Sequence, residues 1–269
     1  MKIIFNKNKL LKLIRKEQNI GFVPTMGSLH KGHSSLIKKS SSQCKKTIVS
    51  IFINKPQFNK FSDFQKYPRI LSKDIKILKE LKVDFLYLPS SKEIYPYGTN
   101  RKIKIHKFSK FLCGKFRPGH FKAVVDVVDR FIKIIKPKKI FLGEKDFQQL
   151  KLIEHFLIRN KIKTKIVMCK TIRESGGLAC SSRNVLLSWH EKKIASKVYK
   201  LLLKEKKNLI NNKITLSNIK NKLFKTGLTS IEYLSLINIS NIIRPYKKKK
   251  GYKIFIGYYL RKTRLIDNI

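Results

Sequence analysis

The sequence predicts an α/β fold, with a doubly wound parallel sheet in a Rossmann-like domain over residues 1–170 and a smaller α+β domain over residues 171–269. Two observations predict it. Short runs rich in β-branched and aromatic residues alternate with helical periods through the first domain, which is typical of a parallel sheet covered by helices. Polar segments follow three of these runs, and ligands bind to such sheets at the C-terminal ends of the strands.

The alternation gives the expected elements in chain order. In the first domain the β-rich runs are Gly21–Pro24, Thr47–Ile53, Phe85–Leu88, Lys139–Leu142 and Lys165–Cys169. The segments with a helical period are Leu29–Ser40, Asp74–Leu81, Phe121–Ile135 and Gln148–Asn160. In the second domain we expect two helices and then two strands, at Trp189–Asn208, Ile219–Lys225, Ile231–Ile237 and Lys253–Leu260.

Composition limits the class of protein. The 269 residues are 42% apolar, which is enough to form a packed core. With 62 Lys and Arg against 16 Asp and Glu, the formal net charge is +46, a value that would ordinarily indicate a nucleic-acid or anionic-membrane partner. However, the lysines are scattered through every expected element, and their longest block is Lys247–Lys250. We therefore attribute the charge to a composition bias and expect neither specific nucleic-acid binding nor a membrane partner.

The cysteines and the N-terminal segment indicate the compartment. Cys44, Cys113, Cys169 and Cys180 are widely spaced, with no histidines at zinc-site spacing, so we expect buried, reduced thiols. The first 17 residues alternate apolar and basic residues and lack the apolar stretch and cleavage site of a signal peptide. Since no apolar run approaches the length of a membrane span, we expect a cytoplasmic protein.

The segment Pro24–His33 joins an expected strand to an expected helix and carries two glycines and two histidines. A helix N-terminus offers unpaired N–H groups to an anion, and Gly27 and Gly32 let the backbone approach it closely. His30 and His33 are three residues apart, so on a helix they share one face and can both donate hydrogen bonds to a phosphate. We favour a phosphate-binding turn over the alternative, a loop with two surface histidines.

A second polar segment follows the expected strand Thr47–Ile53. Pro56 ends this strand and leaves Asn54 and Gln57 on a loop, where neutral amides can bind hydroxyl groups or a carboxylate. Ordinary turn chemistry explains the same residues equally well.

A third segment, after Lys139–Leu142, repeats the order of strand, glycine and helix start. Gly143 permits close approach, and Lys145 is a point cation suited to phosphate oxygens. Asp146 and Gln149 would point from the new helix toward the same cleft. A plain helix cap by Asp146 is the competing explanation, and both can hold together.

A fourth segment lies at the start of the second domain. Ser181 and Ser182, followed by Arg183, make a second phosphate clamp, and Gly176 and Gly177 suggest a mobile loop that closes over a nucleotide. The alternative is that Ser181 caps a helix and Arg183 is a surface charge.

A fifth segment, from Arg117 to His120, precedes the expected helix Phe121–Ile135. A rigid helix entry formed by proline and glycine explains it as well as a catalytic role does.

Together with three further segments, these motifs resemble the pantothenate synthetase family of the HxGH adenylyltransferase superfamily over essentially the whole chain. In order the segments read PTMGSLHKGH, SIFINKPQF, YPRILSKD, EIYPYGT, RPGHF, FLGEKDFQQL, RESGGLACSSRN and RLIDN. The resemblance implies a ligase that joins D-pantoate to β-alanine with ATP and Mg²⁺, through pantoyl adenylate, and releases pantothenate, AMP and diphosphate. It also implies a cytoplasmic homodimer, with the C-terminal domain forming a lid over the site.

The resemblance implies a role for each matching residue, but it identifies no metal ligand. Gln57 would bind pantoate and border β-alanine, and Gln149 would bind pantoate. The catalytic residues would be His33 as proton donor, His30, Lys145 and Arg183. The ATP contacts would be Met26, Gly27, Ser28, Leu29, His30, Lys31, Gly32, His33, Gly143, Glu144, Lys145, Asp146, Ile172, Cys180, Ser181, Ser182 and Arg183.

Several positions depart from the family pattern. The order Lys55–Pro56 stands where the family commonly has its proline one residue earlier, which can reshape the pantoate loop. Gly176 replaces a frequent aspartate and would loosen its loop, and Ala123 and Asp126 replace a small residue and a hydroxyl residue. Because none of these changes removes a residue with a direct role, we expect activity to be retained.

Two other hypotheses stay open from the sequence. One is an ATP-dependent adenylyltransferase of the same fold that acts on a different acid or on a nucleotide, and the other is a basic RNA-binding protein. Loss of pantoate use on changing Gln57 or Gln149 excludes the first, and steep loss of RNA adhesion with salt excludes the second.

Overall fold

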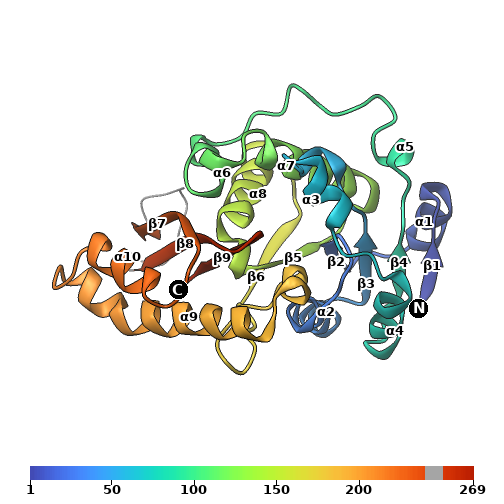
Figure 1. Ribbon diagram of the computed structural model, residues 1–269. Helices are drawn as coiled ribbons and strands as arrows, with labels where there is room; N and C mark the ends of the chain where they lie inside the picture. The colour runs from blue at the N-terminus through green and yellow to red at the C-terminus, as the bar shows by residue number, and fades with distance from the viewer. Residues whose placement is uncertain (240–250) are drawn as a thin grey trace. The chain divides into compact units, whose positions relative to one another are not determined.

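The computed structural model describes residues 1–239 and 251–269, which form two compact units (Figure 1). The first unit comprises Met1–His106 and Arg117–Lys170, and the second comprises Lys107–Phe116 and Thr171–Ile269. The second unit thus includes Lys107–Phe116, a segment that the sequence analysis assigns to the first domain. The predicted fold class, a parallel α/β sheet with a smaller α+β part, is confirmed.

The first unit is built on a six-stranded sheet in the order β1-β4-β3-β2-β5-β6, in which every neighbouring pair is parallel. The five predicted strands are all present. The edge strand β1, which the sequence analysis does not predict, is three residues long and pairs with β4. The strands are β1 (Lys2–Ile4), β2 (Ile20–Thr25), β3 (Lys46–Ile51), β4 (Phe85–Tyr87), β5 (Lys139–Gly143) and β6 (Lys165–Cys169).

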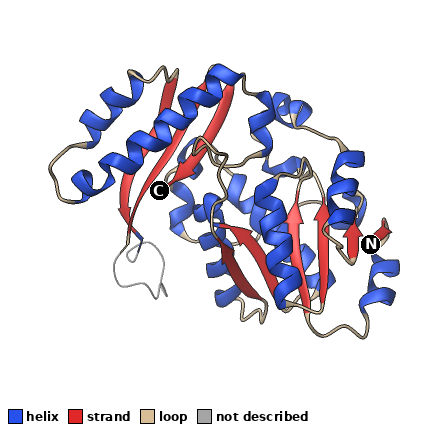
Figure 2. Cartoon of the chain, turned by 90° about the horizontal axis from the view of Figure 1, so that it is seen from below, coloured by secondary structure: helices blue, strands red, loops and turns tan. Residues whose placement is uncertain are grey.

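Alternation along the strands explains why helices cover both faces of this sheet. Phe22 and Ile48 belong to one hydrophobic cluster, whereas their neighbours Val23 and Val49 belong to another. Successive side chains of a strand point to opposite faces, so the two clusters are the two sides of the sheet. Residues of α1 (Lys7–Ile14), α7 (His120–Ile135) and α8 (Phe147–Arg159) complete the first cluster, and residues of α2 (Lys31–Gln43) and α4 (Leu71–Glu80) complete the second. Figures 1 and 2 show helices on both sides of the sheet. This is the doubly wound arrangement.

The structure corrects two predicted boundaries in the first unit, one of a helix and one of a strand. The predicted helix Leu29–Ser40 begins at Lys31, because His30 is its N-cap, and the predicted strand Thr47–Ile53 ends at Ile51. Three short helices, α1, α3 and α5, are not predicted. The helices are α1 (Lys7–Ile14), α2 (Lys31–Gln43), α3 (Phe61–Lys66), α4 (Leu71–Glu80), α5 (Ser91–Ile94), α7 (His120–Ile135) and α8 (Phe147–Arg159), with 3₁₀ turns η1 (Lys55–Gln57) and η3 (Glu144–Asp146).

The second unit packs two amphipathic helices on an antiparallel sheet in the order β7-β8-β9. Both predicted helices and both predicted strands are present, and β9 is an addition. Its elements are η2 (Lys107–Lys110), α6 (Cys113–Phe116), η4 (Ser182–Leu186), α9 (Trp189–Ile210), α10 (Leu216–Phe224), β7 (Ser230–Asn238), β8 (Tyr252–Leu260) and β9 (Thr263–Asn268).

Side-chain contacts explain why Lys107–Phe116 belongs to the second unit. The Cys113 thiol lies 2.9 Å from the Tyr233 hydroxyl and 3.4 Å from the Arg264 guanidinium. Arg264 forms an ion pair with Glu232, so α6 is held to β7 and β9 by partly buried polar contacts.

All four cysteines lie in the described part of the chain, where they are buried and form no disulfide, as their spacing predicts. Among residues 1–239 and 251–269, no helix combines the length and the apolarity needed to cross a membrane.

Candidate active site

The predicted phosphate turn, which follows β2, has an unusual backbone conformation that hydrogen bonds from other residues hold in place. Gly27 has a φ of +79° and Ser28 a φ of +51°, so two successive residues are left-handed. A Cβ at Gly27 would lie 2.9 Å from Oδ2 of Asp74, so glycine is required by both conformation and space. Thr25 closes the start of the turn, since its hydroxyl accepts from the Gly27 amide at 3.2 Å and donates to the Ser50 carbonyl at 2.7 Å.

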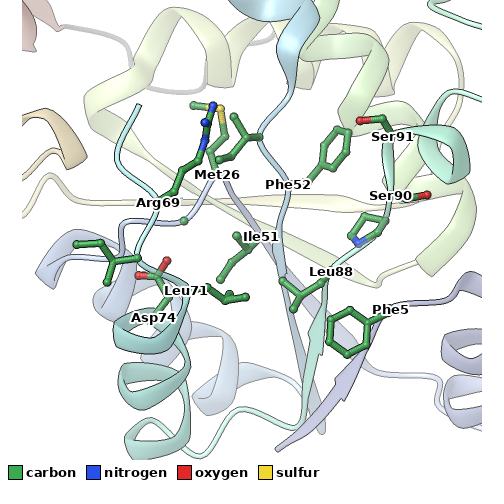
Figure 3. A pocket seen from close by; sticks show the side chains of 14 residues that line it. Phe5, Met26, Ile51, Phe52, Arg69, Leu71, Asp74, Leu88, Ser90 and Ser91 are labelled. Carbon is green, nitrogen blue, oxygen red and sulfur yellow. The ribbon is translucent and has the colours of Figure 1, made fainter. Parts of the chain in front are cut away.

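Asp74 is a site residue that the sequence analysis assigns no role. It is only 2% exposed, in the first turn of α4, and its two carboxylate oxygens accept hydrogen bonds from the amides of Ser28 (2.8 Å) and Leu29 (2.7 Å). Figure 3 shows its carboxylate at the start of the helix, below Met26 and Arg69. Asp74 is the last residue of the YPRILSKD segment, which the sequence analysis quotes as part of the family resemblance. Nothing in the sequence indicated that its carboxylate holds the phosphate turn.

His30 and His33 come together, although by a different route from the one the sequence predicts. His30 lies at the N-cap rather than inside the helix, and its Nδ1 accepts from the Gly32 amide at 3.1 Å. In the neutral ring the proton is then on Nε2, so His30 can offer a donor from that nitrogen. The ring centroids of His30 and His33 are 4.1 Å apart.

Both imidazoles are kept neutral by their surroundings. Burial, reinforced by the positive charge of Lys145, lowers the pKa of His30 to about 4, although Asp146 opposes this shift. Burial, with additional repulsion from His30 and Lys145, lowers the pKa of His33 well below its ordinary value. Nδ1 of His33 is buried and finds no hydrogen-bond partner among the described residues. Two neutral rings beside a helix N-terminus and a lysine form a site that favours an added anion.

The segment after β5 contributes Lys145 to the same place. The strand ends at Gly143, the 3₁₀ turn Glu144–Asp146 follows, and α8 begins at Phe147. A Cβ at Gly143 would meet no described atom within 4 Å, so its missing side chain leaves open space. Asp146 occupies the N-cap position, but its side chain makes no capping hydrogen bond. β2 and β5 are parallel neighbours, so the two predicted segments leave the same edge of the sheet, and the positive charge of Lys145 helps to lower the pKa of both histidines.

Gln57 is held by main-chain and side-chain contacts in the first unit. Its carbonyl accepts from the guanidinium of Arg117 at 3.2 Å and from Nδ1 of His120 at 2.8 Å. Its side-chain Nε2 lies 3.1 Å from the sulfur of Met26, which joins the loop after β3 to the phosphate turn. The fifth sequence motif therefore supports the Gln57 loop, which favours the structural explanation of Arg117 and His120. Gln149 is half-buried in the first turn of α8.

A cavity of about 490 Å³ lies at the ends of β2, β3 and β4 in the first unit (Figure 3). Met26, Gly27 and Asp74 line it, whereas His30, His33 and Lys145 do not. Its other lining side chains are mainly apolar, including Ile51, Phe52, Leu71 and Leu88. The cavity thus borders the phosphate turn, but it does not include the two histidines and the lysine that we expect to bind an anion.

The remaining predicted ATP contacts belong to the second unit. The Cys180 amide donates to the Ile172 carbonyl at 2.9 Å, which closes the loop between them. Ser181 is the N-cap of η4 and accepts from the Arg183 amide at 3.3 Å, so the capping alternative describes Ser181 correctly. A Cβ at Gly176 would lie 2.5 Å from the Ser196 hydroxyl and one at Gly177 2.3 Å from the Tyr199 ring. Both glycines therefore allow close packing.

The described part of the chain offers no cluster of three or more His, Cys, Asp and Glu side chains that could hold a metal ion.

Comparisons with known proteins agree over the whole chain. The Pantoate-beta-alanine ligase family model matches residues 2–269. A pantothenate synthetase of Francisella philomiragia is 43% identical over 262 residues, which cover 97% of this chain and 93% of the relative. One from Fervidobacterium nodosum is 37% identical over 277 residues, with coverage of 100% and 99%.

Solved structures give the same result. The Pantoate-beta-alanine ligase of Francisella tularensis, complexed with beta-gamma ATP and β-alanine, has 40% sequence identity and a TM-score of 0.87, and the match covers 100% of this chain and 97% of that chain. The pantothenate synthetase of Thermus thermophilus has 29% identity and a TM-score of 0.88, with coverage of 100% and 99%.

Proposed function

The chain belongs to the Pantoate-beta-alanine ligase family and condenses pantoate with β-alanine using ATP, and we propose that it does so through a pantoyl-adenylate intermediate formed at the phosphate turn of the first unit. In the first step the pantoate carboxylate forms a bond to the α-phosphorus, and the bond to the departing diphosphate breaks. In the second step the β-alanine amine attacks the acyl carbon, the amide bond forms as the nitrogen releases a proton, and AMP leaves with the electron pair of the broken bond between the acyl carbon and oxygen.

The observation that carries this proposal is the convergence of His30, His33 and Lys145 at the N-terminus of α2. Phosphoryl transfer depends mainly on positioning and on charge stabilisation. Lys145 supplies a fixed positive charge, the helix supplies N–H groups, and His30 supplies an Nε2 donor whose tautomer is set by Gly32. A bound triphosphate would raise the pKa of His33, which then serves as the proton donor.

The remaining ATP contacts are proposed for the residues that match the family segments. In the first unit these are Met26 to His33 and Gly143 to Asp146, and the open space beside Gly143 supports them. Ile172 and Cys180 to Arg183 would supply the second clamp, with the second unit acting as the lid. Replacing Arg183 by alanine should then lower the rate of adenylate formation about 10- to 100-fold.

Gln57 and Gln149 are proposed to hold pantoate, with Gln57 bordering β-alanine as well. The contacts of Gln57 with Arg117, His120 and Met26 support this role, because they fix its backbone and aim its amide toward the phosphate turn. The order Lys55–Pro56 leaves Gln57 at the end of a 3₁₀ turn with these contacts intact.

Mg²⁺ is proposed to enter with ATP, because the triphosphate itself provides the oxygen ligands that this ion prefers. When bound, it neutralises part of the triphosphate charge. The family resemblance also supports a cytoplasmic location and a homodimer. Light scattering of the purified chain, which measures its mass in solution, tests the homodimer.

The decisive experiment measures diphosphate, AMP and pantothenate from the purified chain with ATP, Mg²⁺ and D-pantoate, with and without β-alanine. We expect diphosphate release that requires pantoate, and AMP and pantothenate only after β-alanine is added. A folded sample that turns over ATP with another acid but not with pantoate would contradict the proposal.

Two variants separate this function from other adenylyl transfers on the same fold. Gln57→Ala and Gln149→Ala should each raise the KM for pantoate at least tenfold while leaving the KM for ATP within about twofold. Unchanged pantoate dependence in both variants would show that the acid is held elsewhere. Specific binding of RNA is not expected, and adhesion of RNA should disappear as salt is raised.

A further inference from the structure

A line of hydrogen bonds leads from the interior of the first unit to the amide of Gln57. The Tyr95 hydroxyl donates to Oδ1 of Asn54 at 2.6 Å. Nδ2 of Asn54 then donates to Oε1 of Gln57 at 3.1 Å, and Nε2 of Gln57 points at Met26 of the phosphate turn. Asn54 is only 1% exposed, so its amide depends on these partners for its hydrogen bonds.

The direction of this line is fixed at Asn54 by a backbone group. Nδ2 of Asn54 also donates to the carbonyl of Ala123, on α7, at 3.3 Å. A carbonyl oxygen only accepts, so the NH₂ end of the Asn54 amide must face Ala123 and its oxygen must face Tyr95. The reversed amide would set two acceptors against each other in a buried place, and a buried acceptor without a donor costs about 1–3 kcal/mol.

The same argument fixes Gln57. Because Asn54 offers it an N–H group, the oxygen of the Gln57 amide faces Asn54, and its NH₂ group is presented outward beside Met26. Gln57 then offers a hydrogen-bond donor to the site. A donor suits the carboxylate and hydroxyl oxygens of an acid such as pantoate.

Tyr95 is itself held in place. The Arg130 guanidinium lies 4.6 Å from the centre of its ring and donates to the carbonyls of Ile94 and Gly98 on either side. Arg130 is in turn paired with buried Asp126 at 2.7 Å, which also accepts from the amide of Asn100. Asp126, a departure from the family pattern, therefore anchors the loop that carries Tyr95.

The protonation state of Tyr95 suits a donor. Burial, together with the negative charge of Asp126, raises its pKa, although Arg130 and the hydrogen bond to Asn54 oppose this shift. The hydroxyl consequently keeps its proton at any pH at which the protein is used, and the direction of the line does not change with pH.

We propose that Tyr95 is a positioning residue which, through Asn54, fixes the Gln57 amide with its NH₂ group toward pantoate. The inference rests on the proposed role of Gln57 in binding pantoate, and it adds a residue 38 positions further along the chain that contacts no substrate. Without the Tyr95 hydroxyl, the Asn54 oxygen loses its donor. The Asn54 amide is then held only through its Nδ2, by the Ala123 carbonyl and Gln57, and it positions the Gln57 amide less firmly.

The first test is kinetic, with Tyr95→Phe and a matched control. Tyr87→Phe is the control, because it also removes a tyrosine hydroxyl from this unit, one that donates to Glu93 at 3.0 Å and has no part in the line to Gln57. We expect Tyr95→Phe to raise the KM for pantoate about tenfold and to leave the KM for ATP within about twofold. Tyr87→Phe should leave both constants within about twofold.

The second test separates positioning from general damage. Tyr95→Phe is combined with Gln57→Ala, and the pantoate KM of the double variant should lie within about twofold of that of Gln57→Ala alone. If Tyr95→Phe has its full effect in the Gln57→Ala background, or if Tyr87→Phe raises the pantoate KM equally, Tyr95 does not act through Gln57 and the proposal is wrong.

A third measurement needs no substrate and holds even if pantoate is not the acid. The side-chain amide protons of Asn54, assigned in ¹⁵N spectra by their loss in Asn54→Ala, should exchange slowly in the unchanged protein and in Tyr87→Phe. In Tyr95→Phe they should exchange at least tenfold faster. Equal exchange in all three proteins would overturn the proposed line, whereas lack of pantoate turnover in the unchanged protein would overturn only the proposed function.

Discussion

The amide of Leu29 donates a hydrogen bond of 2.7 Å to the carboxylate of Asp74, although 45 residues separate them. With the bond from Ser28, this contact uses both oxygens of a buried acid to hold a turn whose backbone is left-handed at two successive positions. The conformation of the phosphate turn therefore depends on α4 as much as on its own glycine.

Removing the Asp74 carboxylate should damage both stability and catalysis. Hydrogen bonds to a charged group contribute about 1.5–3 kcal/mol each, so we expect loss of both bonds in Asp74→Ala to lower the free energy of unfolding by about 3–6 kcal/mol. Asp74→Asn keeps one acceptor and should lose about half as much, with kcat/KM for ATP reduced about 10- to 100-fold. Urea unfolding and diphosphate release measure these effects. Glu80→Gln, an exposed change on the same helix, is the control and should alter neither.

Two glycines of the site should respond differently to alanine. Gly27→Ala meets both a positive φ and a Cβ position 2.9 Å from Asp74 and 3.1 Å from Ile51, so we expect a loss of about 2–4 kcal/mol in unfolding free energy. Gly143→Ala meets no described atom within 4 Å and should leave stability within about 0.5 kcal/mol. If ATP approaches Gly143 closely, that variant should still raise the KM for ATP several-fold. An unchanged KM would remove Gly143 from the ATP contacts.

His33 should be essential for the first half-reaction. His33→Ala removes an imidazole that is buried beside His30 and is expected to reduce diphosphate release at least 1,000-fold without changing the far-ultraviolet circular dichroism. His190→Ala, which removes an exposed histidine from α9, is the matched control and should retain full activity. Near-normal diphosphate release from His33→Ala would contradict the proton-donor role.

Acid should lower the free energy of unfolding through His30. Burial lowers the pKa of His30 to about 4 in the folded chain, whereas the unfolded chain keeps the ordinary value of about 6.5. The unfolded chain therefore binds more protons between these values, and the contribution of His30 to stability is complete above about pH 6.5 and falls as the pH drops toward 4.

Replacing the His30 imidazole tests this dependence of stability on pH. From pH 7 to pH 5 the free energy of unfolding should fall by about 2 kcal/mol less in His30→Gln than in the unchanged protein, as urea titrations at the two pH values can measure. His190→Gln is the control and should keep the full dependence. A His30→Gln protein that loses as much stability as the unchanged one would show that His30 does not remain neutral on folding.

Local patterns were sufficient for the central strands. β2, β3 and β5 are short apolar runs whose alternate side chains enter two different clusters, and such runs are recognisable without knowledge of their partners. The edge strands β1 and β9 are short and contain lysine, arginine, aspartate or asparagine, so their sequences do not stand out. They are strands because β4 and β8 provide hydrogen-bond partners for them.

The start of α2 and the role of the fifth motif could be assigned only from the structure. The sequence places His30 inside a helix, but its side chain accepts from the Gly32 amide and makes it the N-cap. Arg117 and His120 were open to two explanations, because their contact, the Gln57 carbonyl, lies 60 or more residues away in the chain.

By itself, the sequence determined the fold class, the family and the segments that would supply the phosphate-binding groups, because strand periodicity, glycine placement and residue type are properties of short stretches of chain. Only the tertiary structure decided which groups hold those segments. The bonds of Asp74 to the phosphate turn, the charge of Lys145 acting on the two histidines and the bond of Tyr95 to Asn54 all join distant parts of the chain. The positions and hydrogen-bonding directions of such groups follow from packing across the sheet.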